Sequence, residues 1–481
     1  MEVCVLGTGY VGLVTGTCLA YLGRSVVCVD IDERKIRMLR EGRTPIYEPG
    51  LEPLIHIGLQ RGNLKFSTDI AASVRESEII FIAVGTPPLT NGRADLSYVK
   101  AVAQDVGRSL DCERRRIVVN KSTVPIGSGN WVEMLVREGL SDNPSYREKI
   151  ASVAANQESK AVTSRRLNAV KPEEIFLIAS NPEFLREGSA ISDTFYPDRI
   201  VIGATNGYAA ERLRALYQPI VEQNFIAPAM APRPAGFTAV PVVTTDLTSA
   251  EMIKYAANAF LATKISFANE IANICERVGA DIKEVVRGFG LDSRIGPKFL
   301  NAGLGWGGSC FGKDISALID IAKEYGYDPS LLHSTVEVNR HQRLVPVQKL
   351  QEVLKIIKGK TIGLLGLAFK PETDDLRDAP ALEIAQQLIE MGARVKVYDP
   401  VANEVCRQQQ PDLKIEYADD ALSLAEDCDA LVIVTEWEEF RHLELGSIGE
   451  VMNTKVLIDG RNVFDPDAVE ALGFKYRGIG R

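Results

Sequence analysis

The stretch Gly7-Thr8-Gly9-Tyr10-Val11-Gly12 follows directly after the apolar run Val3-Cys4-Val5-Leu6. An apolar run followed by glycines at this spacing predicts a strand, a tight turn and a helix. The first two glycines allow a pyrophosphate to approach backbone N–H groups, and the third allows the helix to pack on the strand. Asp30 ends the next strand candidate, where a carboxylate would bind a ribose hydroxyl. The stretch predicts a dinucleotide-binding unit; the alternative is a Gly-rich turn that binds no nucleotide.

The charges near this stretch bear on which dinucleotide is bound. The carboxylate of Asp30 would repel a 2′-phosphate, which favours NAD over NADP. Lys35 lies close in sequence and acts in the opposite direction, since a cation attracts a phosphate. We expect NAD as the cofactor, with contacts from the residues of the glycine-rich stretch: Gly7, Gly9, Tyr10, Val11 and Gly12.

Short β-branched runs alternate with helical stretches on both sides of a helical middle. In the first 200 residues or so the strand candidates are 3–6, 25–30, 79–84, 117–120, 175–179 and 199–202. The alternation restarts after Lys360, with strand candidates at 361–365, 395–398, 431–435 and 456–459. Such alternation is typical of βαβ units on a parallel sheet.

The middle of the chain carries the longest helical pattern, residues 246–277, which contains no Gly or Pro. Thr248 and Glu251 fit a capping box near its start. We predict an α/β fold in which a central helical domain with a long spine helix joins two Rossmann-like doubly wound domains. The predicted boundaries are 1–240, 241–345 and 346–481. Two segments, 141–172 and 227–241, interrupt the pattern as insertions, and the sequence assigns no role to them.

Composition excludes several classes of protein. The chain has 481 residues, 46% hydrophobic and 25% charged, which is ordinary for a globular protein and unlike a disordered or collagen-like chain. Its net charge of −9 disfavours a general nucleic-acid or anionic-membrane binder. The sequence shows no membrane-spanning run and no basic signal segment, so we expect a cytoplasmic protein. Eight cysteines without a CxxC pair argue against a disulfide framework, and we expect no metal site.

Three polar clusters follow strand candidates immediately. They are Gly85-Thr86-Pro87-Pro88, Lys121-Ser122-Thr123-Val124-Pro125 and Asn181-Pro182-Glu183-Phe184-Leu185-Arg186-Glu187. In open parallel sheets, ligands bind beyond the carboxyl ends of the strands. We expect cofactor and substrate contacts here; the alternative for each cluster is a turn that Pro terminates.

Two further motifs carry reactive side chains. Lys254 and Asn258 lie four residues apart and share one face of the long helix, although a lysine there can also be a snorkelling one. Cys310 follows a run of glycines and precedes a helical stretch expected at 315–325. A helix N-terminus and the adjacent Lys313 favour a thiolate, and Asp314 could act as a base. Cys310 is therefore either an activated nucleophile or a buried structural thiol.

The last domain contains an incomplete dinucleotide-binding motif and several candidate phosphate-binding cations. Gly363-Leu364-Leu365-Gly366 follows a strand start but lacks the third glycine of a dinucleotide site. Lys370, Arg377 and Arg461 are candidate phosphate-binding cations, or else ordinary solvated charges.

Taken together, these motifs resemble the nucleotide-sugar dehydrogenase family, and most closely its members that act on UDP-glucose. The resemblance runs nearly end to end. It includes KSTVP (121–125), NPEFLREG (181–188), SAEMIKYAANAF (249–260), GGSCFGKD (307–314), GLAFKPETDDLRDAP (366–380) and DGR (459–461). Gly312 departs from the family, whose members often have Pro at this position.

The resemblance implies an NAD-dependent, four-electron oxidation of UDP-glucose at C6 to UDP-glucuronate. Cys310 would be the nucleophile, passing through a thiohemiacetal and a thioester. Thr123 and Asp314 would position water, Lys254 and Asn258 would stabilise oxyanions, and Glu183 would assist hydrolysis.

The resemblance also implies ligand contacts and an assembly. NAD would contact Asp30, Lys35, Thr86, Thr123, Glu187, Lys313 and Arg377. The UDP-sugar would contact Glu183, Phe184, Leu185, Arg186, Glu187, Lys254, Asn258, Arg294, Phe299, Asn301, Gly303, Gly307, Lys370 and Arg461. Because the Arg294 position reaches a neighbouring subunit's site in this family, we expect a homodimer or a higher homo-oligomer.

Three other functions compete with this one. GDP-mannose dehydrogenases share the cysteine loop. UDP-N-acetylhexosamine dehydrogenases usually carry His where this chain has Ser309. A non-catalytic NAD-responsive redox sensor would leave Lys254, Asn258 and Asp314 unexplained.

Overall fold

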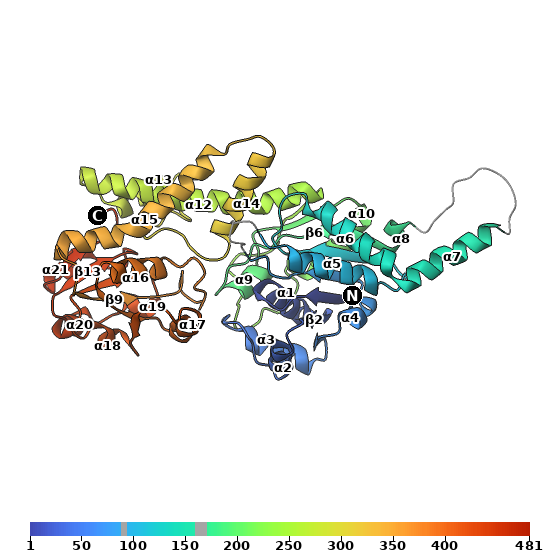
Figure 1. The fold of residues 1–481 in the computed structure, drawn as a ribbon, viewed down its shortest axis with the longest axis horizontal. Helices are drawn as coiled ribbons and strands as arrows, with labels where there is room; N and C mark the ends of the chain where they lie inside the picture. The colour runs from blue at the N-terminus through green and yellow to red at the C-terminus, as the bar shows by residue number, and fades with distance from the viewer. Residues whose placement is uncertain (88–93, 159–170) are drawn as a thin grey trace. The chain divides into compact units, whose positions relative to one another are not determined.

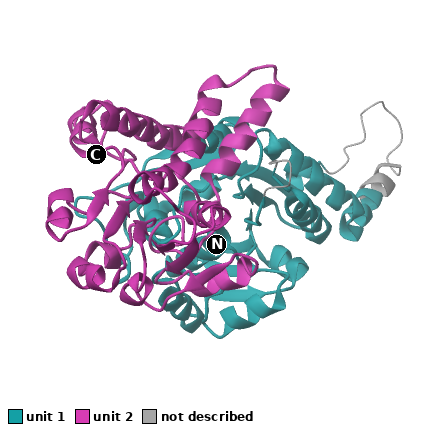
Figure 2. Ribbon diagram, turned by 60° about the vertical axis from the view of Figure 1, so that its left-hand side comes forward, with its two compact units in different colours: residues 1–255 teal, residues 256–481 magenta. Residues whose placement is uncertain are grey.

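A computed structural model describes residues 1–87, 94–158 and 171–481 (Figure 1). The chain divides into two compact units, residues 1–255 and 256–481, which Figure 2 colours separately. The division falls inside the long helix α12 (Leu247–Val278), so this helix belongs to both units. The division into three domains, with boundaries after 240 and 345, stays a prediction.

Unit 1 is built on a sheet with the strand order β3-β2-β1-β4-β5-β6-β7-β8. The order of its first six strands is that of a doubly wound dinucleotide-binding fold. The strands are β1 (Glu2–Leu6), β2 (Ser25–Val29), β3 (Leu64–Ser67), β4 (Ile79–Ile82), β5 (Arg116–Asn120), β6 (Phe176–Ser180), β7 (Ile200–Ala204) and β8 (Val242–Thr245).

One pairing of this sheet differs from the parallel arrangement that the sequence predicts. β6 and β7 run antiparallel and pair only through Ala179 with Ala204 and Ser180 with Gly203. The segment between them, residues 181–199, carries the short helix α9 (Ala190–Phe195). All other pairings of the sheet are parallel.

Helices cover both faces of the unit 1 sheet because its central strands are apolar on both sides. Val3 and Val5 of β1 belong to one buried cluster, and Cys4 and Leu6 belong to another. The helices are α1 (Tyr10–Tyr21), α2 (Glu33–Arg40), α3 (Leu51–Gln60), α4 (Ile70–Glu76), α5 (Ser97–Ser109), α6 (Ser128–Asp142), α7 (Pro144–Glu158), α8 (Pro172–Ile175), α9, α10 (Gly207–Leu216) and α11 (Gln218–Glu222).

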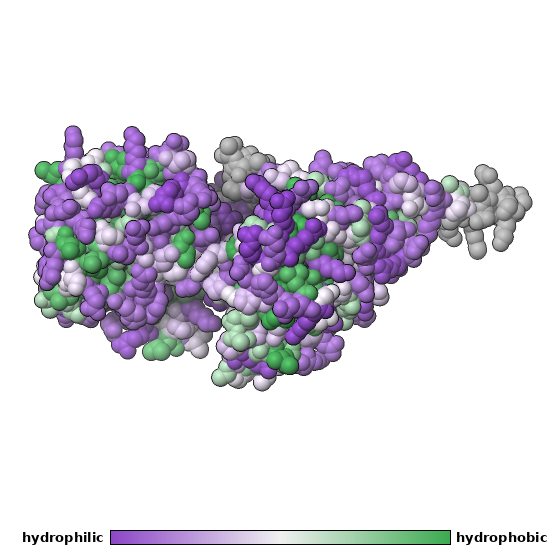
Figure 3. All heavy atoms as spheres, turned by 90° about the horizontal axis from the view of Figure 1, so that it is seen from below, coloured by the Kyte–Doolittle hydropathy of each residue, from purple (hydrophilic) through white to green (hydrophobic). Residues whose placement is uncertain are grey.

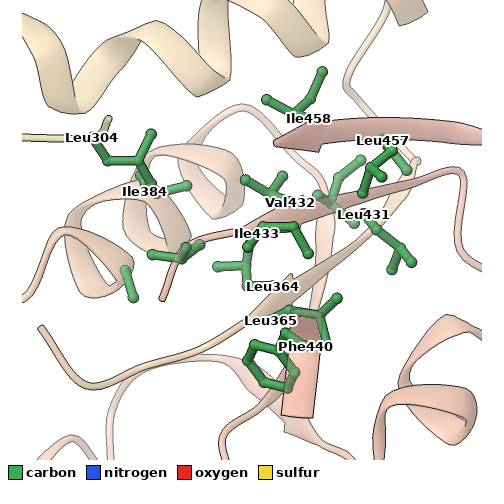
Figure 4. Packing of buried hydrophobic residues seen from close by; sticks show 14 of the residues in the cluster. Leu304, Leu364, Leu365, Ile384, Leu431, Val432, Ile433, Phe440, Leu457 and Ile458 are labelled. Atoms are coloured by element: carbon green, nitrogen blue, oxygen red, sulfur yellow. The ribbon is translucent and has the colours of Figure 1, made fainter. Parts of the chain in front are cut away.

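Unit 2 contains a second sheet, which is parallel throughout and has the order β11-β10-β9-β12-β13-β14. Its strands are β9 (Thr361–Leu365), β10 (Arg394–Tyr398), β11 (Ile415–Tyr417), β12 (Ala430–Ile433), β13 (Val456–Asp459) and β14 (Lys475–Arg477). Figure 4 shows Leu364, Val432 and Ile458 of three neighbouring strands within its buried core. The doubly wound order recurs here, so the predicted fold class of two Rossmann-like sheets is confirmed.

Helices of unit 2 precede and surround this sheet. They are α13 (Ile282–Gly290), α14 (Phe311–Glu324), α15 (Ser330–Leu354), α16 (Pro380–Glu390), α17 (Asn403–Gln409), α18 (Ala421–Ala425), α19 (Glu438–Arg441), α20 (Leu445–Val451) and α21 (Pro466–Ala471). Helix α14 begins at Phe311, four residues before the expected start at 315, and Cys310 is its N-cap residue.

The two insertions differ in structure. Residues 141–172 contain the end of α6, all of α7 and the first residue of α8. Residues 159–170 lie outside the described residues, as does Pro88 of the first polar cluster. Residues 227–241 form no regular helix or strand, as predicted. They are nevertheless tied to the core, because the hydroxyl of Tyr196 donates to the backbone oxygen of Ala231.

Hydrophilic residues cover most of the face shown in Figure 3, and hydrophobic residues lie among them in small groups. Over the part of the chain that the structure describes, no helix has both the length and the apolar character that a membrane crossing requires.

Candidate active site

The three glycines of the turn after β1 differ in whether the fold leaves room for a side chain. A side-chain carbon at Gly7, where φ is +106°, would lie 2.6 Å from the oxygen of Ala83, and one at Gly12 would lie 2.0 Å from the oxygen of Gly7. The same carbon at Gly9 would meet no protein atom within 4 Å. Packing therefore explains Gly7 and Gly12, whereas the open position at Gly9 fits a ligand that approaches the backbone.

The start of helix α1 fits the same ligand. Its N-cap residue, Gly9, makes no side-chain cap, and its first turn holds no acidic residue. Uncapped N–H groups at the positive end of a helix attract a phosphate. Tyr10 donates its hydroxyl to the oxygen of Tyr47, and Val11 packs against one of the buried clusters of unit 1.

Asp30 lies at the end of β2, beside the glycine-rich turn. Its Oδ2 accepts the backbone N–H of Thr8 at 2.9 Å and the Thr8 hydroxyl at 2.7 Å. Burial alone would raise the pKa of Asp30, but hydrogen bonds from Thr8 and Asp32 and the charge of Lys35 outweigh it and hold the pKa below its ordinary value. Asp30 is thus a carboxylate at neutral pH, held where a ribose would bind.

The loops after β4 and β5 are joined to each other. The hydroxyl of Thr86 donates to the backbone oxygen of Thr123 at 3.0 Å. The Ser122 hydroxyl donates to the oxygen of Val84 at 2.7 Å. The strand order reverses between β1 and β4, and ligands bind at such a point. The loop after β4 leaves the sheet beside this point, and the loop after β5 leaves it one strand further on.

Glu183 and Lys254 form a buried ion pair. The Nζ of Lys254, on α12, lies 2.7 Å from the Oε1 of Glu183, and both side chains are 6% exposed. Glu183 Oε2 also accepts the backbone N–H of Leu185 at 3.0 Å. The ring of Phe184 lies 5.5 Å from Lys254 Nζ, measured to its centroid. A buried, paired lysine is unlike the solvated snorkelling alternative.

The two residues that end this cluster are held differently. Arg186 binds Asp193 through two hydrogen bonds, of 2.7 and 3.0 Å, and this pairing raises its pKa. Its guanidinium is therefore already engaged within unit 1. Glu187 is half-buried at the start of the turn that leads to α9.

Lys121 is a buried cation that the sequence analysis did not select as a site residue. Its Nζ donates to Asn181 Oδ1 at 3.0 Å, and Tyr217 donates its hydroxyl to the same oxygen at 2.6 Å. Burial lowers the pKa of Lys121 to about 8, with the charge of Glu183 opposing this shift and that of Lys254 adding to it. A lysine directly after a buried strand is the signal that could have identified it.

In unit 2, Cys310 stands apart from the other cysteines. None of the eight, all of which the structure describes, is in a disulfide; Cys310 is exposed and the other seven are buried. As the N-cap residue of α14 it lies at the positive end of that helix, where a thiolate is stabilised. Its Sγ lies 3.6 Å from the Ser309 hydroxyl. The buried-thiol alternative for Cys310 is therefore wrong.

One helical turn beyond Cys310, Asp314 organises two donors. Asn258 Nδ2 donates to its Oδ2 and Lys313 Nζ to its Oδ1, both at 2.6 Å. Asp314 is 1% exposed, and its backbone N–H donates to the oxygen of Cys310 at 2.9 Å. Asn258 lies one turn after Lys254 on α12, as the spacing predicts.

Polar residues of α12 and α15 hold the loop before Cys310 in place, and no sequence pattern identified them. Asn339 Oδ1 accepts the N–H of Trp306 at 2.7 Å, and Arg343 donates to the Trp306 oxygen at 2.8 Å. Asn269 Oδ1 accepts the N–H of Gly303 at 2.8 Å. A side-chain carbon at Gly307 would lie 2.2 Å from the oxygen of Asp378. Packing within unit 2 thus explains Gly307.

The predicted cations of unit 2 follow its strands. Lys370 lies in the loop after β9, half-buried, with its Nζ 5.8 Å from the ring centroid of Phe369. Arg461 follows β13 and donates its Nε to the oxygen of Val434 at 2.7 Å, beside Glu436. Arg377 pairs with Asp375 through two hydrogen bonds, of 2.7 and 2.8 Å. Lys370 and Arg461 thus follow the carboxyl ends of two strands of one sheet.

Three predicted substrate residues lie on the segment after α13. Arg294 is 87% exposed and pairs with Asp292 at 2.6 Å. Phe299 is half-buried with a φ of +63°, an uncommon conformation for an aromatic residue, and Asn301 is exposed.

The second sheet carries its own acidic residue at the position that corresponds to Asp30. Asp399 follows β10, and its Oδ2 accepts the backbone N–H groups of Leu367 at 2.7 Å and Ala368 at 3.0 Å. Its Oδ1 accepts two more N–H groups, those of Val401 and Ala402, and it is 2% exposed. Because this carboxylate is buried and saturated, unit 2 does not repeat the ribose site of unit 1.

Comparison with known proteins likewise gives the two sheets different ligands. The chain matches the three domains described for the UDP-glucose/GDP-mannose dehydrogenase family: the NAD binding domain over residues 1–221, the central domain over 248–341 and the UDP binding domain over 363–466. The chain belongs to this family. The NAD binding domain contains the sheet of Gly9 and Asp30, so NAD is the cofactor of this protein. The UDP binding domain lies on the sheet that carries Lys370 and Arg461.

Several members of the dehydrogenase family are similar over their whole length. A UDP-glucose 6-dehydrogenase of Bacillus subtilis is 46% identical over 100% of this chain and 93% of its own. A UDP-glucose 6-dehydrogenase of Pseudomonas aeruginosa is 43% identical over 100% of this chain and 98% of its own. The solved structure of a UDP-glucose dehydrogenase from Pyrobaculum islandicum has a TM-score of 0.83 and 38% identity, covering 99% of this chain and 97% of its own. The predicted family is therefore confirmed, while the roles of individual site residues stay predictions.

Proposed function

We propose that this dehydrogenase oxidises UDP-glucose at C6 to UDP-glucuronate, with NAD as the oxidant. The observation that carries the proposal is Cys310, the exposed thiol at the N-terminus of α14, in a chain with relatives that are UDP-glucose 6-dehydrogenases. A redox sensor with no catalysis would not require the buried Lys254–Glu183 and Asn258–Asp314 pairs.

The reaction removes four electrons in two steps. The C6 alcohol loses a hydride and a proton to give an aldehyde. Cys310 Sγ then adds to the aldehyde carbon, because that carbon can release a hydride only after a nucleophile has made it tetrahedral. Loss of the second hydride gives a thioester, and water hydrolyses it to the acid and the free thiol. NAD, when bound, accepts each hydride, so two molecules are reduced for each sugar.

The remaining groups act on charge and on water. Lys254 and Asn258 are proposed to stabilise oxyanions, a role that suits donors fixed in advance by Glu183 and Asp314. Thr123, with Asp314, is proposed to orient the hydrolytic water, and Glu183 is proposed to assist hydrolysis. For the diphosphate of the substrate, Lys370 and Arg461 are the proposed cations, supported by their positions after β9 and β13.

We further propose that the enzyme is at least a homodimer. Phe260, Phe267 and Ile274 of α12 repeat every seven residues and are 65%, 52% and 49% exposed. Such a stripe on one helix face is costly in water and is typical of a surface that pairs with another copy. The largely exposed side chain of Arg294 is consistent with a role in a neighbouring subunit's site. The cytoplasmic location stays a prediction.

Purified enzyme mixed with UDP-glucose and NAD tests the proposed function. We expect two NADH for each UDP-glucose consumed, an acid as the product and little free aldehyde. GDP-mannose and the UDP-N-acetyl sugars, offered in the same assay, should give much lower kcat/KM. A higher kcat/KM for one of these sugars would reassign the substrate, and the absence of any sugar-dependent NADH would refute the dehydrogenase activity.

A further inference from the structure

Glu251 has a buried carboxylate that lies outside the proposed catalytic set, between the loop that carries Thr123 and the turn of α12 that carries Lys254. Glu251 lies on α12, one turn before Lys254, and is 5% exposed. Its Oε2 accepts the backbone N–H of Gly127 at 2.6 Å, and its Oε1 accepts that of Gly129 at 2.8 Å. These N–H groups belong to the N-terminus of α6. The hydroxyl of Ser180, at the end of β6, donates to the same Oε1 at 3.4 Å.

This arrangement replaces the capping box that the sequence predicts for α12. Glu251 does not cap its own helix. That function falls to Asp246, whose side chain accepts the N–H and the hydroxyl of Ser249 at 2.8 and 2.7 Å. Helix α6 in turn lacks a cap of its own, because its N-cap residue Gly127 has no side chain and adopts a φ of +88°. Glu251 supplies from another helix the acceptor that α6 cannot supply itself.

The segment that Glu251 holds is the loop carrying Thr123. The start of this loop is fixed by β4, where the N–H groups of Lys121 and Ser122 donate to the oxygen of Ile82 at 2.9 and 3.0 Å. Its end is fixed by Glu251 at Gly127. Thr123 lies between these two attachments, so its position relative to α12 depends on both.

Residues of the loop and of α12 line the same small cavity. Thr123, Glu251 and Lys254 line one cavity of about 20 Å³, together with Asn120, Lys121, Ser122, Val124, Ser180, Pro182 and Tyr255. A cavity of this volume has room for about one water molecule. A shift of the loop by a fraction of a hydrogen-bond length would therefore change how Thr123 faces Lys254.

We infer that Glu251 is a positioning residue for the reaction: by capping α6 it fixes Thr123 against the turn of α12 that carries Lys254. The inference rests on the proposed function, because Thr123 and Lys254 act there. Burial raises the pKa of Glu251, while the backbone N–H groups at the positive end of α6 oppose this shift and favour the carboxylate. In this role Glu251 acts through the loop, and its own hydrogen bonds are to the backbone N–H groups of Gly127 and Gly129 and the hydroxyl of Ser180.

The test compares Glu251→Gln with a matched control at saturating NAD and UDP-glucose. Gln keeps the size of the side chain, but its amide group would turn a donor towards one of the two N–H groups. We expect kcat to fall at least about tenfold while KM for UDP-glucose stays within about threefold. The control is Glu78→Gln, which removes the charge and one of the two oxygens that accept from Arg212, at the amino end of β4, opposite the site. The kcat of the control should stay within about twofold of that of the wild-type enzyme, even if both variants lower the melting temperature equally.

A double-mutant cycle then asks whether Glu251 acts through Thr123. If it does, adding Glu251→Gln to Thr123→Ala should lower kcat no further, because coupled residues are not additive. Adding it to Arg461→Ala should instead multiply the two effects. Glu251 would be merely structural if Glu251→Gln matched the control in kcat, or if its effect multiplied with that of Thr123→Ala. Failure of the wild-type enzyme to reduce NAD with any of the sugars would instead refute the proposed function.

Discussion

At the scale of single residues, Cys310 is set apart by exposure. Burial raises the pKa of Cys4, Cys18 and Cys28, which makes these thiols inert at neutral pH, whereas Cys310 faces solvent at a helix N-terminus. Brief treatment of the folded enzyme with iodoacetamide should therefore label one cysteine, and treatment of the unfolded chain should label eight. Peptide mass spectrometry would identify the labelled residue.

The same thiol should control acid formation. Cys310→Ser is expected to lower the rate of acid formation by about three orders of magnitude or more, because an alkoxide is scarce near neutral pH where a thiolate is not. Binding of UDP-glucose, measured by calorimetry, should persist since the side chain changes little in size. Cys275→Ala, which removes a buried thiol of the same unit, is the control. Acid formation by Cys310→Ser at a rate near that of the wild type would mean that water attacks the aldehyde directly.

Asp30 should determine the preference for NAD. Asp30→Asn keeps the shape of the side chain and removes the charge that faces a 2′-phosphate, so the ratio of kcat/KM for NAD to that for NADP should fall at least about tenfold, or about 1.4 kcal/mol. Lys35 would then favour the phosphate. Steady-state kinetics with both cofactors measures this ratio. Equal efficiency of the wild-type enzyme with NADP would contradict the role given to Asp30.

The buried Lys121 should make stability depend on pH. With a folded-state pKa of about 8 against an ordinary 10.5, the unfolded chain binds more protons between these values, so the free energy of unfolding should rise with pH in this window. The slope from this group is at most about 1.4 kcal/mol per pH unit. Lys121→Met should remove that rise. Urea unfolding of both proteins between pH 8 and 9.5 would measure it, and equal slopes would count against the shifted pKa.

At the scale of elements, the start of helix α14 is less rigid than it could be. Gly312 lies in its first turn, and a side-chain carbon there would meet Asp378 at 3.4 Å and Trp306 at 3.8 Å, which is ordinary contact. Gly312→Ala should raise the free energy of unfolding by about 0.5–1 kcal/mol, because it restricts the unfolded chain without a clash. Denaturant titration would show the gain. Gly307→Ala, which would meet a backbone oxygen at 2.2 Å, should instead destabilise.

At the scale of the whole molecule, the apolar stripe on α12 should drive association. Replacing Phe260 and Phe267 by Glu should turn the dimer into a monomer, because two charges cannot be buried at an apolar interface. Light scattering coupled to size exclusion would give the mass. Met252 also lies exposed on α12, at 42%, but outside unit 2, and Met252→Glu serves as a comparison that should leave the mass unchanged. A wild-type monomer at micromolar concentration would refute the proposed assembly.

Sequence patterns alone were enough to predict the central strands of both sheets and the glycine-rich turn, and they identified Cys310, Lys254 and Asn258 as candidate site residues. Central strands are buried on both faces, so their apolar runs are continuous and local patterns suffice to find them. The strands that the sequence analysis missed are β3, β8, β11 and β14, and all four lie at sheet edges. An edge strand is short and half-exposed, so its residues carry a weaker pattern.

Which polar groups contact each other could be learned only from the folded chain. Glu251 and Gly127 are 124 residues apart, and local spacing suggested a cap within α12 because it cannot report an acceptor for another helix. The exposure of Cys310, the burial of Lys121 and the saturation of Asp399 likewise depend on hydrogen bonds and packing between distant segments. Sequence patterns record the period and chemistry of each element. Which buried polar group satisfies which partner is set by the folded chain, because a buried group must find its hydrogen bonds wherever packing places them.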